Sequence, residues 1–530
     1  MDERPFYARW RQAVFLRPAL AGLLTIAALL SACAQAPQTT APGRLSTTDL
    51  RWLNTVSFGA DQASVKRLQA IGRQRYLEEQ LAMPLADPPP LAAMIAALPA
   101  SQGDAVQRMQ ALREERQRIN ALPDDAAKLQ AREALNRQGR ELVVDISRRH
   151  LLRALYSPAQ LRAQMTWFWM NHFNVYAAKG QVRYSLADYE EQAIRPHALG
   201  KFRDLLMATV TSPAMLEYLD NAQSAVNRVN ENYARELMEL HTLGVSGGAS
   251  GSRYTQQDVQ ELARVLTGVG VNLRGEPPRL AGPRAALYRS NGLFEFNPNR
   301  HDFAPKTLLG HVIQPRGFAE VEQAVDILAR DPATARFLST KLATYFVSDN
   351  PPASLIDRMA ATYTRTDGDI GAVLTTLFLS RTFDAAAGSE ARKFKDPMVF
   401  VVSSMRLAYD GRTVSNLRPV INWLNQLGEP LYGHVAPDGY PSMESAWASS
   451  GQLVKRFEIA RAIGNGPAGL FAGDDGQPTQ QRGFPMPNNR MFYDTMEGTL
   501  GPATRQALAQ TASQQEWNAV LLSSPEWMQR

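Results

Sequence analysis

The residues best suited to acid–base chemistry occur in one short stretch of the sequence, residues 230–244. A helix turns by about 100° per residue, so a helix here has one polar face. That face carries Glu231, Asn232, Arg235, Glu236 and Glu239. Glu236 and Glu239 are three residues apart, so their carboxyl groups can converge, and a close neighbour raises the pKa of one of them. The stretch therefore predicts a general acid–base pair at Glu236 and Glu239, assisted by Arg235 and His241, with Asn232 binding the substrate.

The same stretch has a second interpretation that needs no catalysis. Glu231, Arg235 and Glu239 follow one another at intervals of four residues, which is typical of an ion-pair ladder on a solvated helix face. His241 falls on the apolar side, where a histidine belongs to a core or a helix C-terminus more often than it binds a ligand. Both interpretations stay open at this point.

Further binding candidates lie on either side of this stretch. Trp167 and Trp169 flank Phe168 in an aromatic run whose rings either stack on sugars or fill the core. Asp258 follows Thr255 by three residues, in a pattern that resembles a helix capping box. The other polar candidates are His172, His197, His301, Asp302 and Lys306.

The histidines, together with the many carboxylates near them, give only a weak signal for a metal site. The chain has 7 histidines, and those at 172, 197, 241 and 301 lie in these segments, but no two have the spacing of a His-Glu-x-x-His helix. A phosphate-binding loop and a dinucleotide fingerprint are also missing from the sequence. We therefore assign no metal ligand, and the sequence indicates no particular cofactor.

Helices must position these candidates, because apolar residues recur at helical spacing along most of the chain. We expect an all-α, multi-helix body with long ordered loops and minor or no β-structure. Residues 45–156 form an N-terminal helical region, in which residues 103–150 make a charged helical hairpin broken at 122–124. Residues 157–412 form the central helical core with the carboxylates and histidines, and residues 413–530 a C-terminal helical region. We interpret residues 271–312 and 433–445 as loops, and residues 465–490 as a lid-like segment.

The N-terminus has the pattern of an export signal. Four arginines precede an uncharged run, residues 18–30, and the sequence Leu30-Ser-Ala-Cys33 closes it. This ending resembles the bacterial lipobox, so residues 1–32 are predicted to be a lipoprotein signal peptide, with a lipid on Cys33. Residues 33–44 have the composition of a flexible tether. A transmembrane anchor with an incidental cysteine is the alternative. Ala34, in place of a retention aspartate, favours the outer membrane of a two-membrane cell.

Charge and cysteine content restrict the partners. The net charge of +6 is small for 530 residues, and no basic block interrupts the chain, so nucleic acid is not expected as a partner. Because Cys33 is the only cysteine, acylation leaves no thiol for a disulfide or for cysteine catalysis in the mature protein.

Several of these segments together resemble a bacterial family known as domain of unknown function 1800. The resemblance rests on residues 167–173, 195–200, 215–221, 230–244, 258–268, 301–307, 331–337 and 439–441. It implies an exported, mostly helical protein without a settled activity, often encoded beside a secreted protein that is similar to alkaline phosphatases and sulfatases. The chain departs from the family pattern in a longer turn at residues 246–253, in Ala304 in place of a usual glycine, and in Asp331 in place of a common histidine.

These observations lead to three functional hypotheses. The first is an envelope hydrolase that cleaves a polysaccharide or peptidoglycan with Glu236 and Glu239, while Trp167 and Trp169 stack on sugar rings. The second is a non-catalytic envelope protein that binds a polysaccharide or a secreted companion protein at the same residues. The third is a metal-dependent enzyme. All three place the protein in the cell envelope, attached to the membrane through Cys33 on the periplasmic or surface side.

Overall fold

Helices make up most of the protein, as the helical spacing of its apolar residues predicts. They account for 62% of the residues, whereas strands account for 5%, which confirms a mainly helical fold with minor β-structure. The computed structural model describes residues 45–245, 254–388, 392–410, 412–473 and 484–530. The predicted signal peptide, Cys33 and the tether lie outside these residues.

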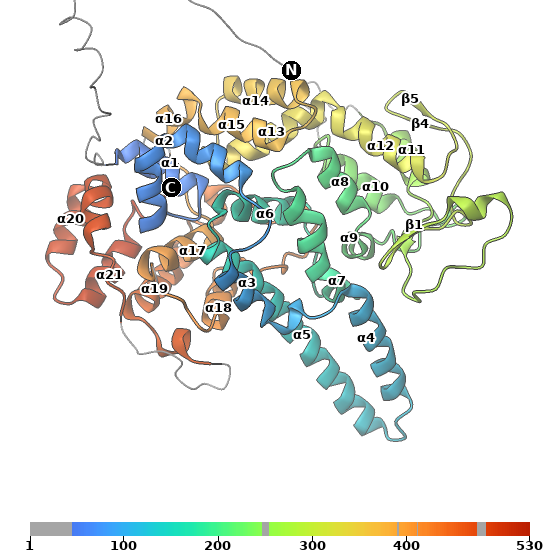
Figure 1. Cartoon of the computed structure of the whole chain (residues 1–530), viewed down its shortest axis with the longest axis horizontal. Coiled ribbons are helices and arrows are strands. Elements are labelled where there is room, and N and C mark those ends of the chain that lie inside the picture. The colour runs from blue at the N-terminus through green and yellow to red at the C-terminus, as the bar shows by residue number, and fades with distance from the viewer. Residues whose placement is uncertain (1–44, 246–253, 389–391, 411, 474–483) are drawn as a thin grey trace, which may run out of the picture. The chain divides into compact units, whose positions relative to one another are not determined.

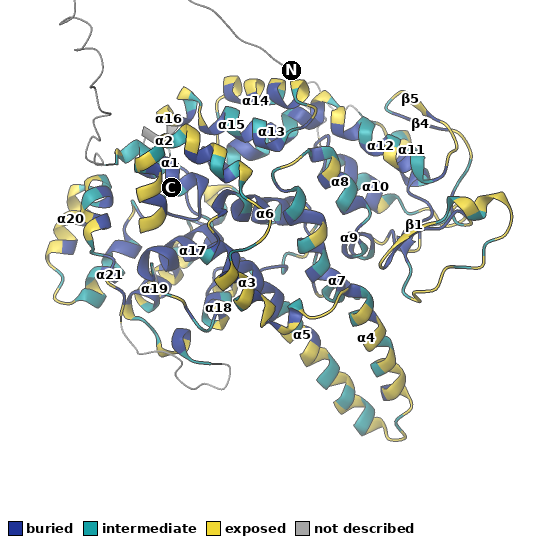
Figure 2. Ribbon diagram, in the orientation of Figure 1, coloured by how far each residue is buried: buried dark blue, intermediate teal, exposed yellow. Residues whose placement is uncertain are grey.

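Two antiparallel helices extend from the body as an arm (Figure 1). The N-terminal helices are α1 (Thr47–Val56), α2 (Gln62–Ala82), α3 (Pro89–Ala96), α4 (Ala105–Asn120) and α5 (Asp125–Tyr156). The arm is the hairpin of α4 and the first half of α5, in the region where the sequence predicts one. Asp124 caps α5 by accepting a hydrogen bond from the backbone N–H of Ala127, at 2.8 Å. Figure 2 shows exposed residues along both helices of the arm and buried ones where α5 enters the body.

The centre of the body is built around a helix that is buried on nearly all sides. This helix, α6 (Gln160–His172), buries all but two of its residues, because it has apolar residues around its whole circumference. A π-helical turn, Tyr189–Ile194, lies against it. The helices that complete this region are α7 (Val182–Asp188), α8 (Phe202–Val210), α9 (Pro213–Tyr218), α10 (Glu231–Glu239) and α11 (Gln256–Val265).

Short strands occupy the segment that the sequence analysis interprets as a loop. The strands are β1 (Val269–Val271), β2 (Arg289–Asn291), β3 (Phe294–Phe296), β4 (Lys306–Leu308) and β5 (His311–Ile313). The first three form an antiparallel sheet in the order β1-β3-β2, with Val269 opposite Phe296, and the last two form a hairpin. Strands of three residues are too short to produce an alternating apolar pattern, so the sequence signal is that of a loop.

The remaining helices cover the top and the C-terminal side of the body (Figure 1). They are α12 (Phe318–Arg330), α13 (Pro332–Phe346), α14 (Ala353–Arg365), α15 (Ile370–Phe378), α16 (Arg381–Gly388), α17 (Pro397–Ala408), α18 (Arg418–Gln426), α19 (Ser450–Asn465), α20 (Pro502–Ala509) and α21 (Gln514–Ser523). Every residue of α17 is buried, so this helix is a second element of the core. Residues from Arg44 onward form one compact unit, and the boundaries expected at 157 and 413 fall inside it. Among the described helices, none combines the length and apolarity that a bilayer crossing requires.

Candidate functional site

A cavity of about 380 Å³ lies between α6, α13, the start of α17 and the segment after α18. Its volume falls in the range of small-molecule binding sites in proteins. Aromatic rings form part of the wall, and ionisable side chains from all four of these segments reach it. These ionisable residues are His172, Lys341, Asp396, Glu429, His434 and Asp438. Since buried or half-buried titratable groups in a cleft are typical of functional sites, this cavity is the candidate site.

Two carboxyl groups meet at the N-terminus of α17. Asp396 is the N-cap and accepts a hydrogen bond from Val399 N–H at 2.7 Å, while Glu429 accepts one from Met398 N–H, also at 2.7 Å. Burial and the nearby charge of Asp396 raise the pKa of Glu429 well above its ordinary value, because two adjacent carboxylates cannot both ionise at low cost. The pair therefore offers a proton donor, Glu429, beside a carboxylate, Asp396.

Lys341 and Tyr345, one helical turn apart on α13, line the same cavity. Burial lowers the pKa of Lys341 to about 8, although the charge of Asp438 acts in the opposite direction. Among the described residues, the Lys341 ammonium makes no hydrogen bond or ion pair, and it lies 5.5 Å from the centroid of the Phe337 ring. The cavity thus contains a half-buried ammonium group without a carboxylate partner.

The mouth of the cavity is formed by residues 434–442, within the loop that the sequence predicts at 433–445. His434 Nε2 lies 3.0 Å from Asp438 Oδ1. Asn171 fixes the loop, because its side chain donates to the Tyr440 carbonyl at 2.9 Å and accepts from the Tyr440 N–H at 2.6 Å. Gly439 has φ +76°, and a Cβ atom there would lie 2.1 Å from the Asn171 carbonyl oxygen. The close approach requires glycine, which gives a physical role to the Gly439-Tyr-Pro441 segment of the family resemblance.

The four predicted residues of α10 flank this cavity and do not line it. Burial and the charges of Glu239 and Asp438 raise the pKa of Glu236, so Glu236 is close to the loop at the mouth. Arg235 lies 3.7 Å from Glu231 and 3.5 Å from Glu239, which is the ion-pair ladder of the non-catalytic interpretation. Asn232 is exposed. The helix thus has the polar face that the sequence predicts, while the structure places the main cavity beside it.

His172 and His241 are both buried, and they contact each other. Their ring centroids are 6.0 Å apart, and His172 Nε2 lies 3.1 Å from the His241 carbonyl oxygen. Burial and the charge of Lys341 lower the pKa of His241 to about 3, and neither of its ring nitrogens has a hydrogen-bond partner among the described residues. His241 is therefore a neutral core residue at physiological pH, while His172 lines the cavity.

The two predicted tryptophans differ in position. Trp167 lines the cavity and packs edge-to-face against His150, with 5.7 Å between the ring centroids. Trp169 has no exposed surface and donates from Nε1 to the Ala198 carbonyl at 3.0 Å, so it offers no face to a sugar ring. His197 is half-buried after the π-helical turn, and burial lowers its pKa.

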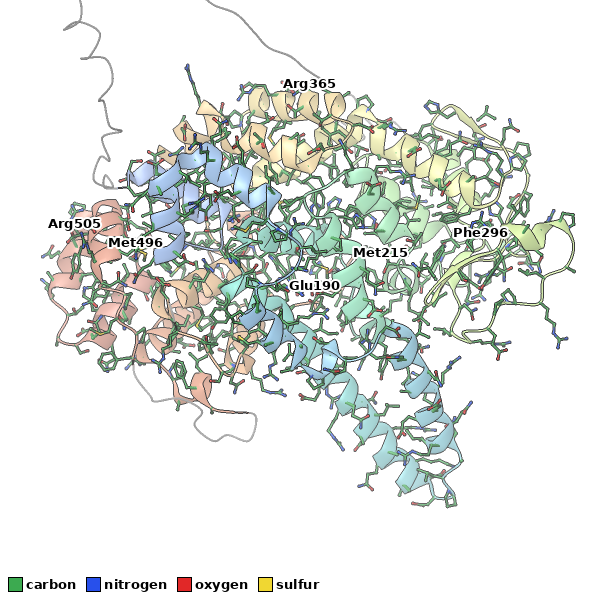
Figure 3. The ribbon with its side chains drawn as sticks, viewed as in Figure 1. Glu190, Met215, Phe296, Arg365, Met496 and Arg505 are labelled. Carbon is green, nitrogen blue, oxygen red and sulfur yellow. The ribbon has the colours of Figure 1, made fainter. Side chains whose placement is uncertain are left out.

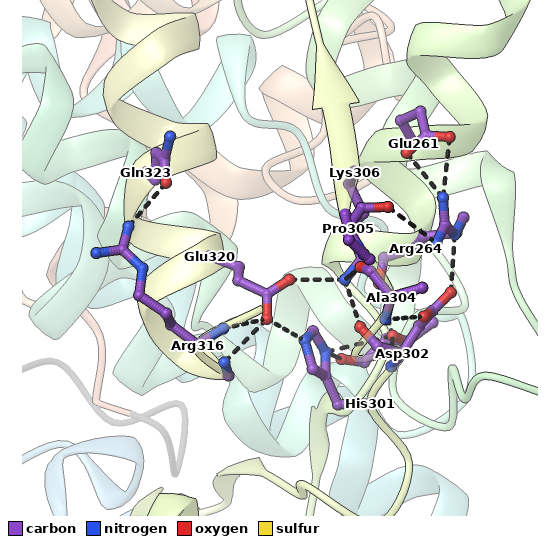
Figure 4. Close-up of polar contacts among 12 residues, drawn as sticks. Glu261, Arg264, His301, Asp302, Ala304, Pro305, Lys306, Arg316, Glu320 and Gln323 are labelled. Carbon is purple, nitrogen blue, oxygen red and sulfur yellow. Dashed lines mark hydrogen bonds and ion pairs between the residues drawn. The ribbon is translucent and has the colours of Figure 1, made fainter. Parts of the chain in front are cut away.

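The predicted residues His301 and Lys306 belong to a buried network that holds the strands to α12 (Figure 4). Glu320 bonds His301 Nε2 at 2.9 Å and Lys306 Nζ at 2.6 Å, and all three side chains are fully buried. Asp302 pairs with Arg264 at 2.7 Å. These side chains have protein partners in the network, which gives it a structural role. The sequence analysis missed Glu320, the residue on which the network centres.

Thr255 and Asp258 form a capping box at the start of α11, as the sequence pattern predicts. One carboxylate oxygen of Asp258 accepts from the Thr255 N–H at 2.8 Å. The other accepts from the Leu309 N–H, also at 2.8 Å. Asp258 therefore joins α11 to the turn between β4 and β5, and both of its oxygens are used by backbone N–H groups.

Behind the cavity wall lies a second buried network that the sequence did not reveal, centred on Glu190 (labelled in Figure 3). Glu190 bonds His150 Nδ1 at 2.8 Å and accepts from the Tyr432 hydroxyl at 2.6 Å. Burial alone would raise the pKa of Glu190, but the charges of His150 and Arg149 lower it below its ordinary value. Tyr432 adopts φ +58°, a left-handed conformation that is unfavourable for tyrosine. The network therefore fixes Tyr432, which lies two residues before His434 of the cavity mouth.

Two larger hollows lie elsewhere on the body. One of about 930 Å³ runs between the helices of the arm, and one of about 460 Å³ lies between the base of the arm and the β2–β3 turn. Neither is lined by a buried glutamate such as Glu429, so the smaller cavity remains the better candidate for chemistry. Within the described part of the chain, no three His, Cys, Asp or Glu side chains converge as metal ligands.

Comparisons with known proteins agree with the resemblance seen in the sequence. A family model described as a protein of unknown function, DUF1800, matches residues 51–529. Neither the curated proteins nor the solved structures contain a match. The matched range includes every segment that lines the cavity, from α6 to the loop at its mouth. The chain belongs to the DUF1800 family.

Proposed function

We propose that this protein is an exported, lipid-anchored hydrolase that cleaves a glycan of the bacterial envelope in the cavity between α6, α13 and α17. The observation that carries the proposal is the carboxyl pair at the start of α17. Glu429 is buried and its pKa is raised, while Asp396 beside it is held by the Val399 N–H. A protonated and an ionised carboxyl group at one site are the two parts that glycoside hydrolysis needs.

In this pair Glu429 acts as the acid and Asp396 as the carboxylate. Glu429 donates its proton to the leaving glycosidic oxygen while the bond between that oxygen and the anomeric carbon breaks. Because the two carboxyl groups are adjacent, Asp396 acts as the nucleophile, and its oxygen bonds to the anomeric carbon as the leaving group departs. Glu429, now a carboxylate, then removes a proton from the water molecule that hydrolyses the Asp396 ester, which restores the starting state of both groups. This assignment moves the acid–base pair from Glu236 and Glu239 to the interior of the cavity.

The walls of the cavity suit a sugar ring. Trp167, Phe168 and Tyr440 line it, but Trp167 and Phe168 are only 4% and 5% exposed, so the half-buried Tyr440 is the ring whose face a sugar can pack against. Tyr440 is fixed at the mouth, because Asn171 bonds both its N–H and its carbonyl oxygen. A ring bound against these side chains lies in a site with fixed geometry, which favours catalysis over loose association.

The test compares Glu429→Gln, Asp396→Asn and Glu236→Gln with the wild type on peptidoglycan and on a set of envelope polysaccharides, by release of reducing ends. Asparagine at 396 retains the helix cap, so loss of activity there is not loss of the helix. We expect the first two variants to lose at least about a hundredfold in rate and Glu236→Gln to stay near the wild-type rate. Equal turnover by Glu429→Gln and the wild type would overturn the assignment, and loss confined to Glu236→Gln would return the site to α10.

Binding without turnover is the second candidate function. The observation that favours it is the groove of about 930 Å³ between the helices of the arm, which is lined by both charged and apolar side chains and could bind a polysaccharide or a secreted companion protein. It predicts that the wild type and Glu429→Gln bind the same polysaccharide equally and that neither releases reducing ends.

The lipid anchor is tested separately. The Cys33→Ser variant should move from the membrane fraction to the soluble fraction and lose incorporation of labelled palmitate. An unchanged membrane fraction would contradict the lipoprotein proposal without affecting the assignment of the cavity.

A further inference from the structure

The charged side chains of the cavity differ in whether they have a hydrogen-bond or ion-pair partner within the protein. Asp396 accepts a backbone N–H at 2.7 Å, and Asp438 lies 3.0 Å from His434. Glu429 accepts a backbone N–H at 2.7 Å. Each carboxyl group of the wall therefore has a partner within the protein, whereas the ammonium of Lys341 has neither a hydrogen bond nor an ion pair among the described residues.

A half-buried ammonium without a partner is costly, because burial removes part of its hydration. The titratable groups nearest to it do not balance its charge. His172 on α6 and His241 after α10 are kept neutral, since burial lowers the pKa of both and the charge of Lys341 lowers it further. Asp438 attracts Lys341 from the loop but is bonded to His434. A bound anion would supply the missing partner.

We propose that Lys341 binds a negatively charged substituent of the ligand, so that this cavity takes an acidic glycan, such as one that contains uronic acid. The inference rests on the proposed function for the identity of the ligand as a glycan. The anion site itself rests on the geometry around Lys341. Carboxylate and sulfate groups share the required chemistry, and the experiment below separates them.

The position of Lys341 also indicates where the anionic group lies relative to the carboxyl pair. Lys341 and Tyr345 are four residues apart on α13, so their Cβ atoms are about 6 Å apart on one face. Tyr345 is at the end of the cavity near Asp396 and Glu429, whose charges raise its pKa together with burial. The charged substituent therefore binds on the α13 side of the cavity that holds the carboxyl pair.

The binding test uses the full-length protein and three oligosaccharides of equal length: a uronate oligomer, a neutral glucose oligomer and a sulfated glucose oligomer. Titration calorimetry at pH 6.5 should give at least about tenfold tighter binding of an anionic oligomer than of the neutral one. Lys341→Met should abolish that preference, and Lys341→Arg should retain part of it. A preference for the uronate identifies a carboxylate ligand, and a preference for the sulfated oligomer identifies a sulfate ligand.

The control is Lys455→Met on α19, because Lys455 is exposed, pairs with Glu458 at 2.7 Å and does not line the cavity. It should keep the anionic preference. Lys341→Met removes a half-buried charge without changing the length of the side chain much, so its melting temperature should equal or exceed that of the wild type. Equal binding of neutral and anionic oligomers by the wild type would overturn the inference, as would a preference that survives in Lys341→Met.

The pH dependence gives a second readout. The pKa of Lys341 is about 8, so affinity for an anionic oligomer should fall as the pH rises through 8, where the ammonium loses its proton. Failure of this inference is distinguishable from failure of the proposed function. Anion binding that depends on Lys341 without any turnover refutes the hydrolase, whereas equal turnover of neutral and acidic glycans refutes the anion site.

Discussion

Replacing Glu429 with glutamine should stabilise the protein at neutral pH, even though the same change should abolish catalysis. Glu429 is buried, and Asp396 lies close to it, so its pKa in the folded protein is well above the ordinary 4.5. Between pH 4.5 and that raised pKa, the folded protein holds a proton that the unfolded chain releases. The stability contribution of Glu429 is therefore fully present below pH 4.5 and is lost as the pH rises. Glutamine has nearly the same shape and stays neutral at every pH.

The size of the expected stabilisation follows from the free-energy cost of keeping Glu429 protonated above its ordinary pKa. Each pH unit above the ordinary pKa costs about 1.4 kcal/mol, so the loss at pH 7 reaches at most about 3 kcal/mol. For a body of this length, an increase of that size in the free energy of unfolding raises the melting temperature by about 3 °C. At pH 4.5 the gain should nearly vanish, because Glu429 is then protonated in the folded protein and already half protonated in the unfolded chain.

The assay is thermal unfolding of the wild type and Glu429→Gln between pH 4.5 and 8, with Glu444→Gln as a matched control. Glu444 is exposed at the start of a short 3-10 turn near the cavity mouth, so its replacement should leave the pH profile unchanged. A melting temperature that gains nothing at pH 7, or gains equally at pH 4.5 and 7, would refute the argument that burial and Asp396 keep Glu429 protonated.

Three other substitutions test the remaining assignments. Glu320→Gln should lower the free energy of unfolding by about 3 to 5 kcal/mol, because it leaves Lys306 buried without a counter-ion. Denaturant titration measures this loss, and a value below about 1 kcal/mol would contradict the structural role of the network. His241→Leu should flatten the acid side of the stability profile. The pKa of His241 is about 3 in the folded protein against 6.5 ordinarily, so its contribution to stability is lost as the pH falls below 6.5. The loss reaches about 2 kcal/mol at pH 5. An unchanged profile in His241→Leu would show that His241 is not the group that titrates. Arg235→Ala should cost less than about 1 kcal/mol, because its ion pairs on α10 are half-exposed and its hydrogen bond to Gln256 on α11 is exposed to solvent. A larger loss in denaturant titration would contradict the interpretation of the ladder as a surface feature.

Local sequence patterns predicted the helical elements well. The mainly helical fold class follows from the spacing of apolar residues, because a helix that packs on a core must repeat that spacing. The cap at Asp258 and the hairpin of the arm follow from signals within a few residues, which act before any tertiary contact forms. Strands β1 to β5 escaped prediction, because three-residue strands depend on pairing with distant partners and leave no periodic pattern.

The residues of the candidate site, in contrast, could not be predicted from local sequence patterns. The polar face of α10 can be derived from one stretch of sequence, since its residues are neighbours on one helix. Asp396 and Glu429 are 33 positions apart in the sequence and meet only because the segment after α18 returns to the N-terminus of α17. The raised pKa of Glu429 and the unpartnered ammonium of Lys341 likewise depend on burial, which no local pattern encodes. The sequence alone therefore determined the family, the helices and the expected export signal. Which carboxyl groups share a cavity was decided by the tertiary structure, because proximity across the chain and removal from water are properties of the packed core.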